Sequence, residues 1–297
     1  MLFVTGITGH SGSYFLKELI AHQYEGPIRC VVRSSSDTSL IDSSGLRIEK
    51  VVGDLNDQEF MDKAMIGVDT DMHIASIFHS VTVIKAAVKN SVRRAILVHT
   101  AGIYSKYKDA SEEYKNIELE VNNIIENNAS QISLVILRPT MIYGNINDNN
   151  MIIFIKMLDK LRLFPVIDHG QSLLQPVNAR DLGKAYYKVL TNPSIMNAEY
   201  ILSGKKPITM LNMFKLISSI LGKKTLFVSV PLAVGVLLAR ILKLFTLGRI
   251  DYIEKVQRMG EDRSFSHAAA TQDFGYDPMP FEEGIRIEVK QYVDKFR

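Results

Sequence analysis

Short apolar runs alternate with amphipathic stretches along the first 140 residues. The runs have the length of buried strands, about five residues, and lie within 1–6, 27–33, 46–55, 69–76, 95–102 and 133–140. Between them, apolar residues recur three and four positions apart, as on one face of a helix, in 14–23, 58–67, 81–92 and 112–128. Strands that alternate with helices predict right-handed crossovers and a doubly wound α/β fold, with a parallel sheet covered on both faces.

The pattern changes after the polar segment NINDNN at 145–150. Helical periodicity continues at 151–161, 179–190, 209–221 and 281–293, with short strand-like pieces at 171–177 and 199–203. We therefore predict a first domain over residues 1–144. Residues 145–297 are expected to return one or two elements to the sheet and to form a smaller C-terminal lobe, which would hold the substrate.

The most apolar stretch is LFVSVPLAVGVLLARILKLF at 226–245. Its uncharged run before Arg240 is 14 residues long and contains Pro231, whereas a membrane span needs about 20 apolar residues. We expect a helix that is buried or lines a groove. The alternative is a helix on a membrane surface, with Arg240 and Lys243 at its polar edge.

Composition narrows the function classes. The 297 residues carry a net charge of only +3, with Lys and Arg dispersed, so we expect no nucleic-acid partner. The single cysteine, Cys30, lies in an apolar run and cannot form an internal disulfide, which suits a reducing compartment. With no N-terminal basic region and cleavage site, the protein is expected in the cytoplasm. No Cys, His and Asp cluster has the spacing of metal ligands, so no metal is expected.

Three glycines follow the first strand run and precede the first helix: Gly6, Gly9 and Gly12. Glycine in such a turn allows a tight bend, a close approach of backbone to a pyrophosphate, and close packing of helix on strand. The helix N-terminus then offers unpaired N–H groups to the phosphates. This pattern predicts a Rossmann-type dinucleotide site. Its residues would be Gly6, Thr8, Gly9, His10, Ser11 and Gly12.

The Gly-x-x-Gly-x-x-Gly spacing resembles the short-chain dehydrogenase/reductase superfamily, particularly its extended branch of nucleotide-sugar epimerases and dehydratases. Further similar motifs follow in order along the chain: Gly-Asp-Leu at 53–55, His-Ile-Ala-Ser at 73–76, Arg-Pro-x-x-x-Tyr-Gly at 138–144, Val-x-x-x-Asp-Leu at 177–182, and FGYDPMPFEEGIR at 274–286. The resemblance implies further cofactor contacts at Asp54, Leu55, Ile74, Ala75, Ser76, Pro139, Thr140 and Met141.

The end of the second strand run bears on which dinucleotide binds. Arg33 lies there, 21 residues after Gly12, and is followed by Ser34, while Asp37 comes only later in the loop. An acidic residue at the strand end would bind the ribose 2′-hydroxyl, whereas an arginine pairs with a 2′-phosphate. The sequence therefore favours NADP over NAD. In the alternative interpretation, Arg33 stacks on adenine or points to solvent.

The resemblance also implies a catalytic strip: a Ser or Thr after the fifth strand, then a Tyr, and a Lys four residues beyond it that lowers the pKa of the Tyr. Thr100 fits the first position and Tyr114 the second. The fourth residue after Tyr114 is Glu118, whose charge would raise the pKa of a phenol. Aligning Glu118 instead on the acidic position that follows the family's lysine puts Tyr114 in the lysine slot and Ala110 in the tyrosine slot.

The Tyr-x-x-x-Lys pair is absent in either alignment, as in atypical members of the superfamily. Other nearby residues are candidates to replace this tyrosine as the proton donor. The first is Tyr104, and the others are Lys106, Tyr107, Lys108 and Lys115.

The leading hypothesis is an NAD(P)-dependent oxidoreductase, or a sugar-nucleotide epimerase, dehydratase or reductase. Thr100 would orient a carbonyl or hydroxyl, and Tyr104 or Tyr114 would move the proton. The substrate would be a small molecule, either a nucleotide sugar or an apolar carbonyl compound, and the resemblance implies a homodimer. The alternative is a non-catalytic NAD(P)(H)-binding sensor or assembly protein.

Overall fold

The computed structural model describes residues 1–107, 109–128 and 132–297. A seven-stranded parallel sheet of order β11-β6-β5-β4-β1-β2-β3 forms its centre. The strands are β1 (Leu2–Thr5), β2 (Ile28–Val32), β3 (Ile48–Val52), β4 (Thr70–His73), β5 (Arg94–Val98), β6 (Ser133–Pro139) and β11 (Ala198–Leu202). The predicted Rossmann-type, doubly wound α/β fold is confirmed.

Helices cover both faces of the sheet. One face packs against α1 (His10–Ala21) and α7 (Ala179–Thr191), the other against α3 (Gln58–Ala64), α4 (Ser80–Lys89) and α5 (Asp109–Asn127), and a short α2 (Ser39–Asp42) follows β2. Neighbouring side chains in a strand point to opposite faces, so Phe3 joins one core and Val4 the other. This explains why the strand runs are apolar throughout rather than alternating. Cys30 is buried in the first of these cores, as expected.

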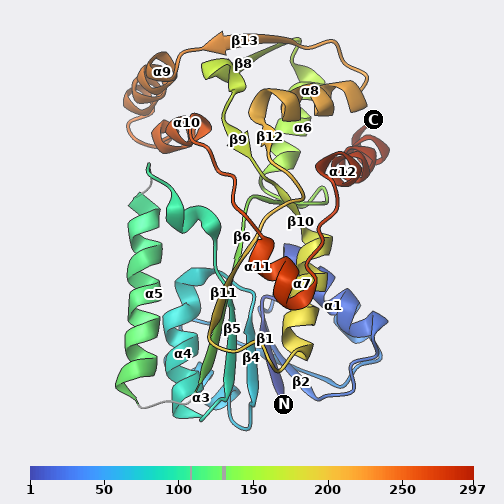
Figure 1. Cartoon of the computed structure of the whole chain (residues 1–297), viewed down its shortest axis with the longest axis vertical. Helices are drawn as coiled ribbons and strands as arrows, with labels where there is room; N and C mark the ends of the chain where they lie inside the picture. Colours follow the sequence, from blue (N-terminus) through green and yellow to red (C-terminus); the bar gives the residue numbers. More distant parts are fainter. Residues whose placement is uncertain (108, 129–131) are drawn as a thin grey trace.

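The second lobe has a core of its own, built from α6 (Met151–Lys160), α8 (Met210–Ile220) and α12 (Phe281–Phe296). Its strands form two-stranded pairs: β7 (Ile142–Tyr143) with β10 (Val177–Asn178), β9 (Leu173–Leu174) with β12 (Ile208–Thr209), and β8 (Leu163–Ile167) with β13 (Leu226–Val230). Helix α10 (Ile253–Met259) also belongs to this lobe, whereas α11 (Ala268–Phe274) packs against α7 and β11 of the first part. In Figure 1 this lobe lies above the sheet, and the chain runs from α10 down to α11 between the two parts.

The prediction of a buried or groove-lining helix over 226–245 is wrong. Residues 226–230 form β13, and the helix that follows, α9 (Leu232–Phe245), buries only Gly235 and Ala239. Many of its large apolar side chains are exposed, up to 82% for Phe245. Hydrophobicity along a sequence shows that a segment favours an apolar environment, but it does not show what provides that environment. Among the described residues, no helix is long and apolar enough to cross a membrane.

Candidate active site

The turn between β1 and α1 requires glycine at two positions. Gly6 has a φ of +73°, and a Cβ there would lie 2.6 Å from the backbone nitrogen of Ala75. A Cβ on Gly12 would lie 2.0 Å from the carbonyl oxygen of Gly6. Both contacts are with backbone, which cannot move aside as a flexible side chain can. The tight turn therefore exists only with glycine at these two positions.

The first turn of α1 offers donors to an anion. Its N-cap, Gly9, has no side chain to bond the exposed N–H groups, and no acidic residue lies in the first turn. A cavity of about 280 Å³ adjoins it, lined by Gly6, Gly9, His10, Ser11, Gly12, Ile74, Ile142 and residues 147–150. The donors and the dipole of α1 fit a dinucleotide pyrophosphate. The sequence predicted a turn at 147–150, but it did not indicate that this segment lies opposite the glycine turn.

A buried histidine holds the loop after β4 against this turn. His73 is fully buried; its Nδ1 lies 2.6 Å from Thr5 Oγ1 and its Nε2 lies 3.2 Å from the carbonyl oxygen of Ser76. Burial lowers the pKa of His73 to about 3, so the ring is neutral. In this state Nε2–H donates to Ser76 and Nδ1 accepts the Thr5 hydroxyl. These bonds fix the loop that contains Ile74, Ala75 and Ser76.

The residues expected near the adenosine lie at the ends of β2 and β3. Arg33, Ser34 and Asp54 are exposed, and Leu55 is half-buried. The backbone N–H of Arg33 donates to Ser36 Oγ at 3.2 Å. Its guanidinium has no hydrogen bond or ion pair within the part of the chain that the structure describes. The charge of Arg33 is therefore available to a ligand.

The three candidate catalytic residues line one cleft of about 380 Å³, together with Pro139, Thr140 and Met141. Thr100 Oγ1 accepts a hydrogen bond from the Gly102 N–H at 3.0 Å, which leaves the hydroxyl proton of Thr100 to donate. Tyr104 is 48% exposed, and its ring centroid lies 5.6 Å from that of Phe265. The Tyr114 ring packs on Phe78 at 5.6 Å.

This cleft adjoins the cavity at the glycine turn, because Ile142 and Asn150 line both. Among the other candidate proton donors, Lys106 and Tyr107 line a separate cavity, and Lys108 lies outside the described residues.

The end of α10 and the segment after it supply charged residues to the cleft that the sequence did not indicate. Arg258 and Arg263 both line it, and among the described residues neither Nε has a hydrogen-bond partner. Burial, followed by repulsion from Arg258, lowers the pKa of Arg263 to about 10, which still leaves its guanidinium charged at neutral pH. Two acidic residues, Glu261 and Asp262, also line the cleft, and both accept hydrogen bonds from protein groups. The two guanidinium groups are the cationic groups of the cleft that suit an anionic ligand. No motif marks these residues, since they follow Thr100 by more than 150 positions.

Glu118 is bonded within the protein and is not among the residues that line the cleft. Its Oε1 lies 2.8 Å from His99 Nδ1 and its Oε2 lies 2.7 Å from Arg138 Nη2, while Arg138 Nη1 also bonds Glu199 at 2.7 Å. Burial would raise the pKa of Glu118, but the bonds from His99 and Arg138 outweigh it and hold the pKa below its usual range. This pairing favours the alignment in which Glu118 is the acidic position and Tyr114 occupies the lysine slot.

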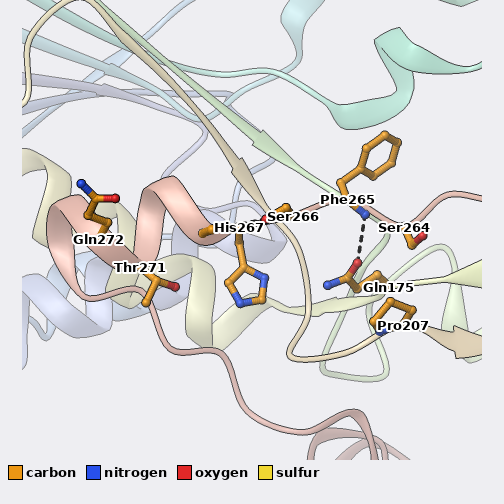
Figure 2. Close-up of a pocket in the computed structure, with 9 residues that line it drawn as sticks. Gln175, Pro207, Ser264, Phe265, Ser266, His267, Thr271 and Gln272 are labelled. Carbon is orange, nitrogen blue, oxygen red and sulfur yellow. Dashed lines mark hydrogen bonds between the residues drawn. The ribbon is translucent and has the colours of Figure 1, made fainter.

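A second cavity of about 630 Å³ borders the cleft, and Figure 2 shows the residues that line it. Gln175 and Phe265 line both cavities. The Gln175 side chain accepts the Phe265 N–H at 2.9 Å and donates to the Gly204 carbonyl at 2.7 Å. His267, also in this cavity, places Nδ1 2.8 Å from Ser203 Oγ. Gln175 therefore fixes the wall that separates the two spaces.

A doubly wound sheet, a glycine turn at a helix N-terminus and an adjoining polar cleft define a dinucleotide-binding protein. A sequence model of the NAD(P)H-binding family matches residues 6–160, and the chain belongs to this family. The predicted NAD(P)-binding family is thereby confirmed.

Among curated proteins, sterol demethylase protein B of Methylococcus capsulatus is 36% identical over 73 residues. That match covers 25% of this chain and spans only about a fifth of the relative, 21% of its length.

Several solved structures share the fold over nearly their whole length. The protein gox2253 superposes with a TM-score of 0.80 at 20% identity, covering 100% of this chain and 99% of its own. UDP-glucose 4-epimerase of Thermotoga maritima, solved with UDP-glucose, gives 0.74 at 17% identity and the same coverage. The dTDP-glucose 4,6-dehydratase of Streptomyces venezuelae, solved with NAD, gives 0.75 at 18% identity and covers 99% of this chain and 97% of its own. At these identities the likeness shows the fold alone.

Proposed function

We propose that the protein is an NAD(P)H-dependent oxidoreductase that acts on a carbonyl or hydroxyl carbon of an anionic small molecule. The observation that carries this proposal is the cleft itself. Thr100, Tyr104 and Tyr114 share it with Arg258 and Arg263, and it adjoins the cavity at the glycine turn. Residues 1–144 would hold the cofactor, and residues 145–297 would provide most of the substrate contacts.

Each group has a distinct role in this proposal. Bound at the glycine turn, the cofactor supplies a hydride in the reductive direction. The Thr100 hydroxyl donates a hydrogen bond to the carbonyl oxygen and orients it. The phenol of Tyr104 or Tyr114 would donate the proton that the carbonyl oxygen takes up when the carbonyl is reduced to an alcohol. Water then reprotonates the phenolate.

The two arginines of the cleft favour a phosphorylated substrate over an uncharged one. Two guanidinium groups match the oxygens of a diphosphate, which carries negative charge at every pH near neutrality. Known structures with this fold bind sugar nucleotides, UDP-glucose among them. We therefore favour a nucleotide sugar over an apolar carbonyl compound. The neighbouring cavity of Figure 2 would accommodate the part of the substrate farthest from the cofactor.

The cofactor proposal is NADPH, because Arg33 is exposed at the end of β2 with its guanidinium free to pair with a 2′-phosphate. Fluorescence titration with NADPH and NADH tests it. A charge-assisted hydrogen bond contributes about 1.5–3 kcal/mol, so Arg33→Ala should weaken NADPH binding by about 10–100-fold and leave NADH almost unchanged. Tighter binding of NADH by the unaltered protein would contradict the proposal.

The substrate class is tested separately by calorimetric titration with UDP-glucose in the presence of NADPH. Arg258→Gln and Arg263→Gln should each weaken binding by about tenfold or more, because each removes a partly desolvated charge from the anion. Arg162→Gln, at an exposed arginine outside the cleft, is the matched control. Equal affinity of the unaltered protein and all three variants would show that neither Arg258 nor Arg263 binds the substrate.

Catalysis is tested by reduction of a panel of nucleotide keto-sugars, followed as oxidation of NADPH. Thr100→Ala should lower kcat by about 10²-fold or more, and whichever of Tyr104→Phe and Tyr114→Phe removes the proton donor should lower it similarly. Turnover that survives in all three variants would exclude these roles.

A second function, non-catalytic binding of NAD(P)(H) by a sensor or assembly protein, is favoured by one observation. The Tyr-x-x-x-Lys pair is missing, and Glu118 is committed to His99 and Arg138. Tight NADPH binding without turnover across the panel would support this function over the first.

A further inference from the structure

An exposed apolar stripe runs along α9 and is separate from the cleft. Its side chains recur at spacings of three and four residues and therefore lie on one side of the helix: Val234, Leu237, Leu238, Ile241, Leu244 and Phe245. We call these six residues the α9 stripe. Exposure is greatest at its C-terminal end, 75% for Leu244 and 82% for Phe245, and Leu247 just beyond is 88% exposed. An uncovered apolar surface of this kind marks an interaction site.

The charged residues of α9 and of the turn that follows it are all positive. Arg240, Lys243 and Arg249 are the charged residues between 232 and 250, a range that the structure describes completely. The acidic Asp251, just beyond this range, bonds Lys243 at 2.6 Å and neutralises it, whereas the side chains of Arg240 and Arg249 have no hydrogen bond or ion pair within the described part of the chain. The charges left without a partner beside the stripe are therefore both positive. Positive charge beside an apolar stripe is complementary to a surface with negative charge above an apolar interior.

We propose that the α9 stripe is a docking surface for a lipid bilayer that contains anionic phospholipids. The helix would lie in the plane of the membrane interface, with Leu237, Leu244 and Phe245 among the upper acyl chains. Arg240 and Arg249 would then reach the headgroup phosphates. In Figure 1, α9 lies at the outer edge of the upper lobe.

The same charges disfavour a second copy of the chain as the occupant. A two-fold interface would press the stripe against itself, so that Arg240 and Arg249 of both copies lie in one contact. No acidic residue between 232 and 250 would neutralise them. A bilayer with anionic headgroups provides the apolar cover and the missing charge together.

Docking through α9 would bring the cleft close to the membrane. Helices α9 and α10 pack together, and a Cβ on Gly235 of α9 would lie only 3.0 Å from Val256 Cγ1. Arg258, two residues further along α10, lines the cleft. The docking surface nevertheless requires neither cofactor nor catalysis, so its test is independent of the proposed function.

The absence of tryptophan from the sequence gives a specific reporter. Phe245→Trp places the protein's single indole on the stripe, and Ile66→Trp places it at a comparably exposed apolar residue near α3. We expect vesicles of phosphatidylcholine with phosphatidylglycerol to shift the emission of the Phe245→Trp protein to shorter wavelength, and brominated acyl chains to quench it. The Ile66→Trp protein should show neither change.

Sedimentation with the same vesicles tests the two components of the surface. Leu237→Glu with Leu244→Glu should lower the bound fraction by about tenfold or more, since it puts two charges on the inserted face. Arg240→Gln with Arg249→Gln should weaken binding by about fivefold per residue at low salt, and less in high salt. Ile66→Glu is the matched control, and an unchanged circular dichroism spectrum and urea unfolding curve show that each variant is folded.

Three results would overturn the proposal. They are no sedimentation with anionic vesicles, equal sedimentation of the Leu237→Glu, Leu244→Glu protein, and a dimer in light scattering that this double variant dissociates. The last result would assign the stripe to a second copy of the chain.

Discussion

At the scale of single residues, the cofactor site depends on contacts between backbone atoms that no side chain can replace. The carbonyl oxygen of Gly6 accepts the N–H of Gly9 at 2.9 Å and lies against Gly12, where a Cβ would approach it to 2.0 Å. The turn and the start of α1 are thus packed on each other directly.

Gly12→Ala should therefore disrupt both the fold and the cofactor site. The added methyl group must displace backbone, so we expect a loss of about 2–4 kcal/mol in the free energy of unfolding, as for other strained core substitutions, and weaker NADPH binding. Gly9→Ala is the control, because its Cβ would meet the same oxygen at 3.0 Å and needs only a small adjustment. Urea unfolding and fluorescence titration measure the two effects. NADPH affinity unchanged in Gly12→Ala would show that the pyrophosphate binds elsewhere.

Asp71, in the middle of β4, is a buried carboxyl group, and neither of its oxygens has a hydrogen-bond partner in the part of the chain that the structure describes. Burial raises its pKa well above the usual value. The folded protein therefore holds the proton, while the unfolded chain releases it above pH 4. This contribution to stability is fully present below the unfolded pKa and is lost as the pH rises toward the folded pKa.

Asp71→Asn should consequently become more stabilising as the pH rises. We expect a small difference from the unaltered protein at pH 4, which grows by up to about 1.4 kcal/mol per pH unit until the folded carboxyl would ionise. Urea unfolding from pH 4 to pH 8 measures it, with Asp294→Asn at an exposed ion pair as the control. A difference that does not change with pH would mean that Asp71 is ionised in the folded protein.

At the scale of elements, a buried polar network attaches α5 to the sheet. It runs from Ser80 on α4 through His99 and Glu118 to Arg138 on β6. The Ser80, His99 and Glu118 side chains follow one another as in a hydrolase triad, but Ser80 is fully buried and no acyl substrate can reach it. The lowered pKa of Glu118 makes the network stabilising above the ordinary carboxyl pKa of about 4.3, and this stability is lost as the pH falls.

Glu118→Lys separates the two alignments of the catalytic strip. The structure predicts that the lysine would lie beside Arg138 and leave two buried cations without enough acceptors. We expect a loss of about 3–5 kcal/mol in the free energy of unfolding and no gain in turnover. Glu120→Lys, on the same helix at an exposed ion pair with Lys85, should cost about 0–1 kcal/mol. Faster turnover in Glu118→Lys would instead identify position 118 as the lysine slot.

The elements predicted correctly are those whose burial is evident from their own pattern of apolar and polar residues. Each strand run is apolar because both faces of the sheet are covered, and the turn from Gly6 to Gly12 is constrained locally by backbone packing. By contrast, α9 has the composition of a buried helix, and nothing within 226–245 shows that its neighbours leave it uncovered. Arg258 and Arg263 were missed for a related reason. They enter the cleft through a tertiary contact that carries no local sequence signal.

At the scale of the whole molecule, the cleft lies between the two lobes, and one buried carboxylate joins its walls. Glu261, from the segment after α10, accepts the Ser105 hydroxyl at 2.8 Å and the Lys106 N–H at 2.6 Å. Ser105 follows the 3₁₀ turn η2 (Ala101–Tyr104), which begins directly after Thr100. The position of Tyr104 therefore depends on a residue more than 150 positions later in the chain.

Glu261→Ala should loosen this connection without unfolding either core. Two bonds to a charged acceptor are lost, each worth about 1.5–3 kcal/mol, but relaxation and water entry at the edge of the cleft should limit the net loss in unfolding free energy to about 1–3 kcal/mol. We expect faster amide hydrogen exchange over residues 101–107 and a lower kcat, because Thr100 and Tyr104 are no longer held in register with Arg258 and Arg263. Glu282→Ala, which breaks an exposed pair with Arg286, should change none of these quantities. Exchange that accelerates over the whole chain would mean that Glu261 stabilises the fold in general, whereas acceleration confined to 101–107 shows that it couples the two walls of the cleft.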